Sequence, residues 1–222
     1  MFIGHFAVAL AAKKAAPRVS LGTLFLSVSL VDLLWPFFLL FGFEHVRIVP
    51  GITVVTPLDF YDYPITHSLV TSLGWSLLAG VIFFALKKDM RSSLIVGLAV
   101  FSHWVLDFIT HRPDLPLAPG DTARLGLGLW DSLPATIILE LGMFSAAWYI
   151  YTRFTDARGR AGRISLWSWT IFVIAIYFAN LFGPPPPNET ALAYTALAAW
   201  LFVPWGYWIN SQRTMSSASL PG

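Results

Sequence analysis

Six apolar runs, each about as long as a membrane-spanning helix, constrain the fold of this 222-residue chain more than any other feature. They cover Ser20–Phe43, Ile65–Leu86, Ser92–His111, Leu133–Thr152, Ser165–Phe182 and Thr190–Ile209. Because 56% of the residues are hydrophobic and only 12% are charged, the chain is too apolar for an ordinary soluble domain. We therefore predict an all-α integral membrane protein, a bundle of about six transmembrane helices.

The two ends of the chain differ from these runs. The apolar segment Met1–Ala12 is too short to span a bilayer, so we expect a half-membrane or re-entrant helix packed against the bundle. Its positive charges follow the apolar stretch, the reverse of a cleavable signal peptide, so we expect the segment to be retained. Residues 1–210 are predicted to form one helical membrane domain, and residues 211–222 a disordered tail.

Basic residues indicate the orientation of the bundle. All but three of the 14 Lys and Arg residues lie in connections that alternate along the chain and include Lys13, Lys87 and Arg158. The excess of positive charge predicts that these connections and the C-terminus are cytoplasmic. We expect a multi-pass protein of the bacterial inner membrane, with the opposite loops facing the periplasm. Since topology accounts for the basic clusters, no nucleic-acid partner is expected.

Ionisable residues inside the apolar runs are the candidates for function, because a charged side chain within a bilayer costs a few kcal/mol or more. They are His5, Asp32, His67, His103, Asp107, His111 and Glu140. At about 1.5 Å per helical residue, four of them share a height of about 18 to 24 Å above the cytoplasmic basic residues: Asp32, His103, Asp107 and Glu140. Convergence from separate helices in one layer predicts a site toward the outer half of the membrane.

The stretch "SHWVLDFITH" carries the densest set of these residues. His103, Asp107 and His111 are spaced four apart, so on a helix they form one stripe with neighbours about 6 Å apart. Adjacent pairs can share an ion, and two ions near Asp107 would fit. Because the chain has no cysteine, any metal must use His, Asp or Glu. Such ligands suit a divalent transition metal, zinc first, with manganese and iron as alternatives.

Further residues complete the predicted site. His67 follows a proline-marked helix start, where Thr66 or Ser68 can orient its ring. Arg112 is placed either to meet an anionic group or to snorkel to lipid headgroups. A carboxylate not committed to metal, Glu140 or Asp32, can serve as general base.

Several of these motifs occur in the order found in a known family. They are "GHFAVALAAKK", "LVDLLWP", "THSL", "SHWVLDFITHRPDLPL" and "GLGLWDSLPATIILE", within about residues 1–150. The chain resembles the bacterial membrane-bound metal-dependent hydrolases, of the type that includes an inner-membrane hydrolase-like protein under damage-response control. The resemblance implies a metal-dependent hydrolase.

The ligand order is more distantly similar to that of zinc-dependent phospholipase C and related single-strand nucleases. That likeness implies two or three zinc ions in a helical site that cleaves phosphoesters. The chain has Thr136 where those enzymes have a further His beside the counterpart of Glu140. This difference favours two ions over three, within a range of one to three.

The expected function is hydrolysis of a lipid or lipid-linked phosphoester at the outer half of the membrane, with membrane lipids as partners. Asp32, Arg112 and Glu140 are the predicted catalytic residues, and the seven ionisable residues above are the predicted metal ligands. A proton- or ion-coupled transporter is the alternative, and a structural membrane subunit is a third reading.

Overall fold

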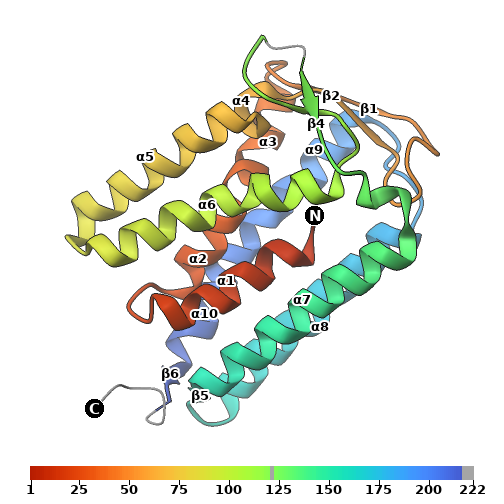
Figure 1. Cartoon of the computed structure of the whole chain (residues 1–222). Helices are drawn as coiled ribbons and strands as arrows, with labels where there is room; N and C mark the ends of the chain where they lie inside the picture. The colour runs from red at the N-terminus through yellow and green to blue at the C-terminus, as the bar shows by residue number, and fades with distance from the viewer. Residues whose placement is uncertain (121–122, 217–222) are drawn as a thin grey trace.

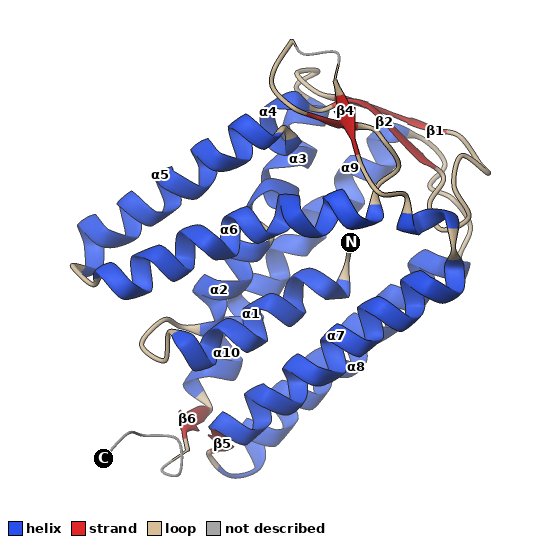
Figure 2. Cartoon of the chain, viewed as in Figure 1, coloured by secondary structure: helices blue, strands red, loops and turns tan. Residues whose placement is uncertain are grey.

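The computed structural model describes residues 1–120 and 123–216, and helices dominate it (Figure 2). The α-helices are α1 Ile3–Ala15, α2 Leu21–Val28, α3 Leu30–Leu40, α4 Pro64–His67, α5 Leu69–Lys87, α6 Met90–Thr110, α7 Leu133–Phe154, α8 Gly159–Phe182, α9 Glu189–Leu197 and α10 Phe202–Ser211. Two short 3₁₀ helices, Leu129–Asp131 and Ala198–Leu201, precede α7 and join α9 to α10.

The helices confirm the predicted all-α membrane bundle. Among the described residues, five helical segments are long and apolar enough to cross a membrane: α5, α6, α7, α8 and the combined segment from α9 to α10. A sixth span is counted if α2 and α3, which are bent by 53° at Ser29, form one broken crossing. Helices satisfy their own backbone hydrogen bonds, which is why apolar runs of this length adopt them in lipid.

Helix α1 forms the centre of the bundle rather than its edge. Ile3, Ala9 and Leu10 are fully buried, and α1 packs against α2, α6 and α7. Its 13 residues span about 20 Å, so it cannot cross the hydrocarbon core alone. Its amino end lies inside the molecule, beside α6 and α7 (Figure 1). The prediction of an N-terminal helix that is too short to span and packs against the bundle is confirmed.

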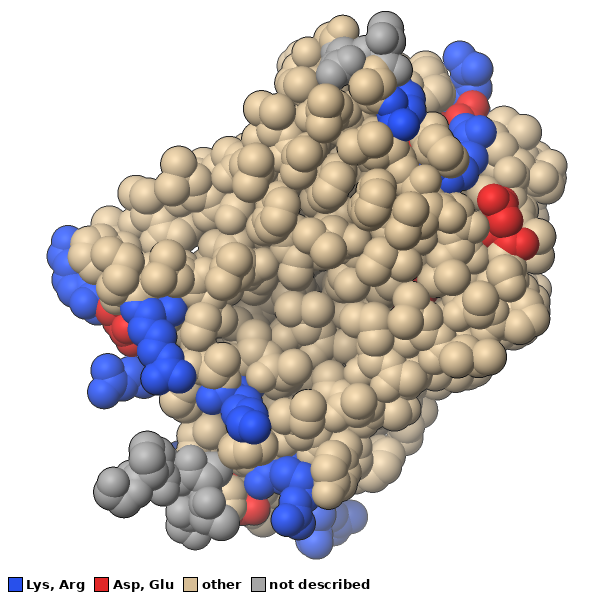
Figure 3. Space-filling model, in the orientation of Figure 1, with Lys and Arg blue, Asp and Glu red and all other residues tan. Residues whose placement is uncertain are grey.

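Charge separates the two ends of the bundle from its sides. Figure 3 shows Lys and Arg gathered mainly at one end, with a mostly uncharged flank between that end and the other. We call the end with Lys13, Lys87 and Arg158 the basic end. Along the flank, α5 exposes large apolar side chains such as Leu77 and buries only Ser72. This surface suits contact with lipid tails, as expected of a multi-pass membrane protein.

Short hairpins close the opposite end, which we call the hairpin end. There β1 (His45–Ile48) pairs with β2 (Leu58–Asp62), and β3 (Leu115–Pro116) pairs with β4 (Arg124–Leu125), both antiparallel. These strands are not predictable from the sequence, because they are too short to show a clear alternation of apolar and polar residues.

The predicted disordered tail needs correction over part of its length. Ser211 belongs to α10, and β6 (Arg213–Met215) pairs with β5 (Thr155–Ala157) at the basic end. Arg213 anchors this pairing, because its guanidinium donates to the carbonyl and hydroxyl oxygens of Thr155. Residues 217–222 of the predicted tail lie outside the described residues.

Candidate metal centre

The break between α2 and α3 fixes the orientation of His103. Val28 is the last residue of α2, where a helix end leaves carbonyl groups without an intrahelical donor. Its carbonyl lies 2.8 Å from His103 Nδ1, which must carry a proton to donate to it. The other ring nitrogen, Nε2, therefore keeps its lone pair when the imidazole is neutral. A neutral imidazole with this tautomer can bind a metal ion through Nε2.

Four predicted site residues surround the space that this lone pair faces. Asp32 Oδ1 lies 3.4 Å from His103 Nε2 and 3.3 Å from His67 Nε2. Asp107 Oδ2 lies 3.0 Å from His103 Nε2 and 3.9 Å from His67 Nε2. Asp32 comes from the first turn of α3, His67 from the end of α4, and the other two from α6.

These separations match the edges of a coordination shell. With metal–ligand bonds of about 2.1 Å, neighbouring ligand atoms lie about 3.0 Å apart in an octahedron and about 3.4 Å apart in a tetrahedron. Three of the four distances above fall in this interval, and the fourth, 3.9 Å between Asp107 Oδ2 and His67 Nε2, is longer. The group Asp32, His67 and His103 can thus hold one ion, with Asp107 beside it.

His5, His103 and Asp107 form a second potential ligand group. The rings of His5 and His103 stack at 3.8 Å, and His5 Nε2 lies 3.2 Å from Asp107 Oδ1. That carboxylate oxygen already accepts from the amino group of Met1 at 2.7 Å. His103 has one free lone pair, so it can serve only one ion. The two groups are therefore alternatives at His103.

Unpartnered nitrogen atoms show that the donor set suits a cation. His103 Nε2 and both ring nitrogens of His5 are buried without a hydrogen bond to any described residue. Buried polar groups are normally hydrogen-bonded, and leaving one unpaired costs about 1 to 3 kcal/mol. A cation in either ligand group would satisfy His103 Nε2, and an oxygen and nitrogen donor set fits a divalent transition metal.

Glu140, another predicted ligand, belongs to neither group. It projects from α7, and its Oε2 accepts backbone N–H groups of Phe2 at 2.9 Å and Gly4 at 3.2 Å. The carboxylate thus stabilises the amino end of α1, where unpaired N–H groups and the helix dipole favour a negative charge. Glu140 fixes the position of the helix that carries His5.

His111 also lies apart from both groups. Helix α6 ends at Thr110, and His111 has an extended backbone at φ −66° and ψ 146°, so the predicted stripe stops one residue short of it. Pro113 explains the ending, because the residue before a proline disfavours helix. His111 Nδ1 lies 2.9 Å from Asp114 Oδ1, and its ring lies 4.2 Å from that of Trp130.

Arg112 likewise binds protein groups in this structure. Its guanidinium contacts Asp59 Oδ1, and its Nε lies 3.2 Å from Asp114 Oδ2. Tyr63 donates to Asp114 Oδ1 from the other side at 3.1 Å. Burial, followed by the nearby charge of Asp114, raises the pKa of Tyr63 well above its ordinary value, so the phenol stays a donor. We call His111, Arg112, Asp114, Asp59 and Tyr63 the His111 network.

Sequence reasoning missed two buried carboxylates in the loops of the hairpin end. Asp114 is one of them, and its place three residues after His111 is the signal that would have pointed to it. Glu44 is the other, and it is 1% exposed although it lies in the loop after α3. Nothing local in the sequence distinguishes Glu44 from an exposed acidic residue.

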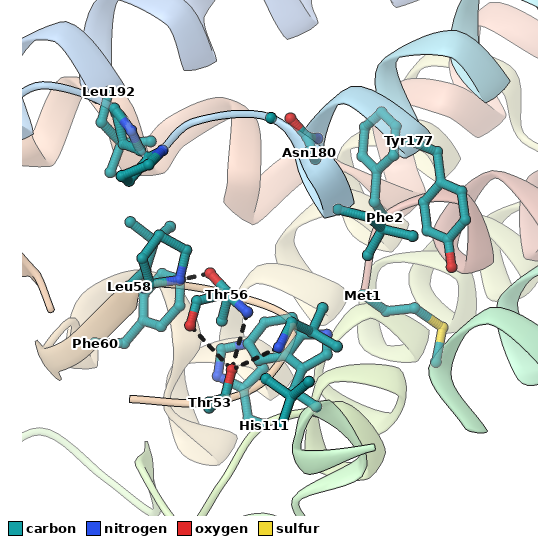
Figure 4. A pocket seen from close by; sticks show the side chains of 18 of the residues that line it. Met1, Phe2, Thr53, Thr56, Leu58, Phe60, His111, Tyr177, Asn180 and Leu192 are labelled. Atoms are coloured by element: carbon teal, nitrogen blue, oxygen red, sulfur yellow. Dashed lines mark hydrogen bonds between the residues drawn. The ribbon is translucent and has the colours of Figure 1, made fainter. Parts of the chain in front are cut away.

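A cavity of about 480 Å³ leads to the candidate ligands. Its lining includes Asp32, His67 and Asp107, together with Glu140 and His111. Figure 4 shows its walls, from Phe2 and Tyr177 across to Leu58, Phe60 and His111. Pro184–Pro186 and residues 50–58 also line it, so it extends toward the hairpin end. Among its described lining residues there is no Lys or Arg.

Comparison with protein-family models, curated proteins and solved structures found no match to this chain. Membership of the membrane-bound metal-dependent hydrolases therefore stays a prediction from the five motifs.

Proposed function

We propose that this protein is a membrane-embedded, metal-dependent hydrolase that cleaves a phosphoester of a lipid or lipid-linked substrate. The observation that carries the proposal is the convergence of His67, His103 and Asp32 from three helices around one space, with Asp107 beside it. These residues would hold one divalent transition metal. Zinc is our first choice, with manganese and iron as alternatives for the same ligands.

When bound, such an ion lowers the pKa of water toward neutrality and offsets the negative charge of a phosphoryl group. Glu140 lines the cavity outside both ligand groups and holds α1 through Oε2, so we assign its other oxygen to take the proton from the attacking water. Asp32 and Asp107 contribute two negative charges that keep the ion in place. Arg112 is committed to Asp59 and Asp114, so we no longer assign it to the substrate.

The cavity supports a substrate with a small polar head and an apolar body. Its inner part presents His and carboxylate groups, whereas Trp35, Phe60 and Leu192 make its walls apolar. A volume of about 480 Å³ holds a headgroup and a few carbon atoms, with the rest of a lipid left outside. If the basic end faces the cytoplasm, the cavity opens at the outer face of a bacterial inner membrane.

A transporter would need a polar route from the candidate metal ligands to the basic end. Below the cluster, α1 continues into a packed apolar core that includes Phe6, Leu10, Phe25 and Trp169. These residues are at most 3% exposed. This packing favours a site reached from one side over a carrier open to both sides.

The test uses purified protein loaded with zinc and vesicles that contain either phosphatidic acid, a phosphomonoester, or phosphatidylglycerol, a phosphodiester. We expect release of phosphate or of a phosphorylated headgroup from one of them, stopped by a chelator and restored by zinc. Glu140→Gln is the matched variant, since it keeps the side-chain shape. A zinc-loaded wild-type protein that cleaves neither lipid would overturn the phosphoester proposal.

A further inference from the structure

We propose that Glu44 and Thr66 are positioning residues that set the tautomer and orientation of His67 for metal binding. This inference rests on the proposed metal site. It concerns two side chains that would not touch the ion, and it assigns a role to a carboxylate that the hydrolase mechanism leaves unused.

Glu44 lies in the turn that follows α3, and it is buried with an exposed fraction of only 1%. Its Oε1 accepts the backbone N–H groups of Ile65 at 2.7 Å and Thr66 at 2.8 Å. Its Oε2 lies 2.7 Å from the hydroxyl oxygen of Thr66. All three bonds are donated to the carboxylate, so both of its oxygens act as acceptors. The Thr66 hydroxyl must therefore donate to Glu44.

The direction of that bond determines the protonation of His67. Thr66 has one hydroxyl proton, and Glu44 takes it. The Thr66 oxygen also lies 2.6 Å from His67 Nδ1, so it can only accept there, and Nδ1 must carry a proton. His67 Nε2 then keeps its lone pair when the ring is neutral. That atom is the one 3.3 Å from Asp32 Oδ1.

Different acceptors thus favour the same tautomer, with the proton on Nδ1, in the two candidate imidazole ligands. His103 Nδ1 faces the Val28 carbonyl, and His67 Nδ1 faces the Thr66 hydroxyl. The second arrangement also ties two helices together, because Glu44 follows α3, which carries Asp32, and binds α4, which carries His67. Glu44 therefore sets both the ring of His67 and the place of α4 relative to α3.

Outer-shell partners of this kind typically contribute about 10- to 100-fold to metal affinity. We expect Thr66→Val to weaken metal binding within that range, because a methyl group replaces the acceptor of Nδ1–H and frees the ring to turn or change tautomer. Glu44→Gln should also weaken binding, since an amide can donate to Thr66 and reverse the chain of hydrogen bonds. Thr66→Ser keeps the hydroxyl and should bind metal as the wild type does.

The experiment measures Co²⁺ affinity by chelator competition and records the visible spectrum of bound Co²⁺, which reports ligand geometry. Thr136→Val is the matched control, because Thr136 is fully buried and its hydroxyl contacts only backbone carbonyls at the start of α7. We expect wild type, Thr66→Ser and Thr136→Val to share one affinity and spectrum, with Thr66→Val and Glu44→Gln weaker and spectrally shifted.

Three results would overturn the inference. Wild-type affinity and spectrum in both Thr66→Val and Glu44→Gln would show that metal binding does not depend on these residues. An equal loss in Thr136→Val would show a general effect of removing a buried hydroxyl. A wild-type protein that binds no Co²⁺ would overturn the metal site itself, and the positioning role with it. Should Thr66→Val not fold, Glu44→Gln and Thr66→Ser decide the outcome.

Discussion

Two groups of ionisable side chains handle their charges differently: the His111 network, which begins just after the end of α6, and the ligand cluster, by which we mean His5, Asp32, His67, His103 and Asp107. In the His111 network, Asp114 contacts His111, Tyr63 and Arg112, and Asp59 contacts Arg112 as well. In the ligand cluster, His103 Nε2 and both ring nitrogens of His5 have no hydrogen bond to a described residue, although Asp107 lies 3.0 Å from His103 Nε2 and 3.2 Å from His5 Nε2. A buried histidine is thus informative through what remains unpaired around it, more than through its depth in the membrane.

Replacing one histidine from each region tests this contrast with the largest expected effect. His103→Ala should reduce zinc affinity by more than the about 10- to 100-fold typical of an outer-shell loss, because it removes a ligand. His111→Ala should leave zinc affinity unchanged. Zinc affinity of both variants, measured by chelator competition, checks this. Equal losses would mean that the two regions form one metal site.

Glu140→Gln tests whether Glu140 acts as a metal ligand or as the general base. We expect turnover of the lipid phosphoester to fall by about 10²- to 10⁴-fold, the usual contribution of a positioned base. Bound zinc should stay at the wild-type level, since Glu140 is outside both ligand groups. Turnover and metal content are measured on one preparation, and loss of zinc from this variant would return Glu140 to the ligands.

Asp114→Asn is the corresponding change in the His111 network, and its effect should be on stability. It removes the carboxylate shared by His111, Tyr63 and Arg112, which we expect to cost about 1 to 3 kcal/mol. Thermal unfolding in detergent measures this, with Asp62→Asn as the control because its partner His45 is half exposed. Reduced zinc content in folded Asp114→Asn would contradict the separation of the two regions.

Tyr63→Phe should give the smallest effect, about 1 kcal/mol of stability from loss of the hydroxyl contacts with Asp114 and His111. Because the pKa of Tyr63 is raised in the folded protein, its neutral form is the one that the fold favours. The contribution of this phenol is therefore constant while it is protonated in both states, and it falls only as the pH rises above about 10. Unfolding of wild type and variant between pH 6 and 9 should differ by a constant amount.

The sequence predicted the spans well because lipid forces long apolar runs into helices. It did not predict the break at Ser29, which has neither glycine nor proline beside it, although Pro36 lies further along α3. That break places the Val28 carbonyl beside His103, so the tautomer of a candidate ligand depends on a feature without a local signal.

The site was predictable where helical spacing holds. His103 and Asp107 are four apart within α6, and the structure brings them together. The same spacing failed for His111 because α6 ends before it. Glu44 could not be identified at all, since its burial depends on α4 folding back onto the loop after α3.

Metal content tests the central claim most directly. The protein is purified in detergent, loaded with zinc, freed of excess and analysed for metal per chain, beside Asp32→Asn at matched folding quality. The structure predicts about one equivalent in the wild type, because His103 offers one lone pair to the cluster, and much less in the variant. No metal above background, after loading with zinc, manganese or iron, would contradict the account and leave these residues to a proton or ion pathway.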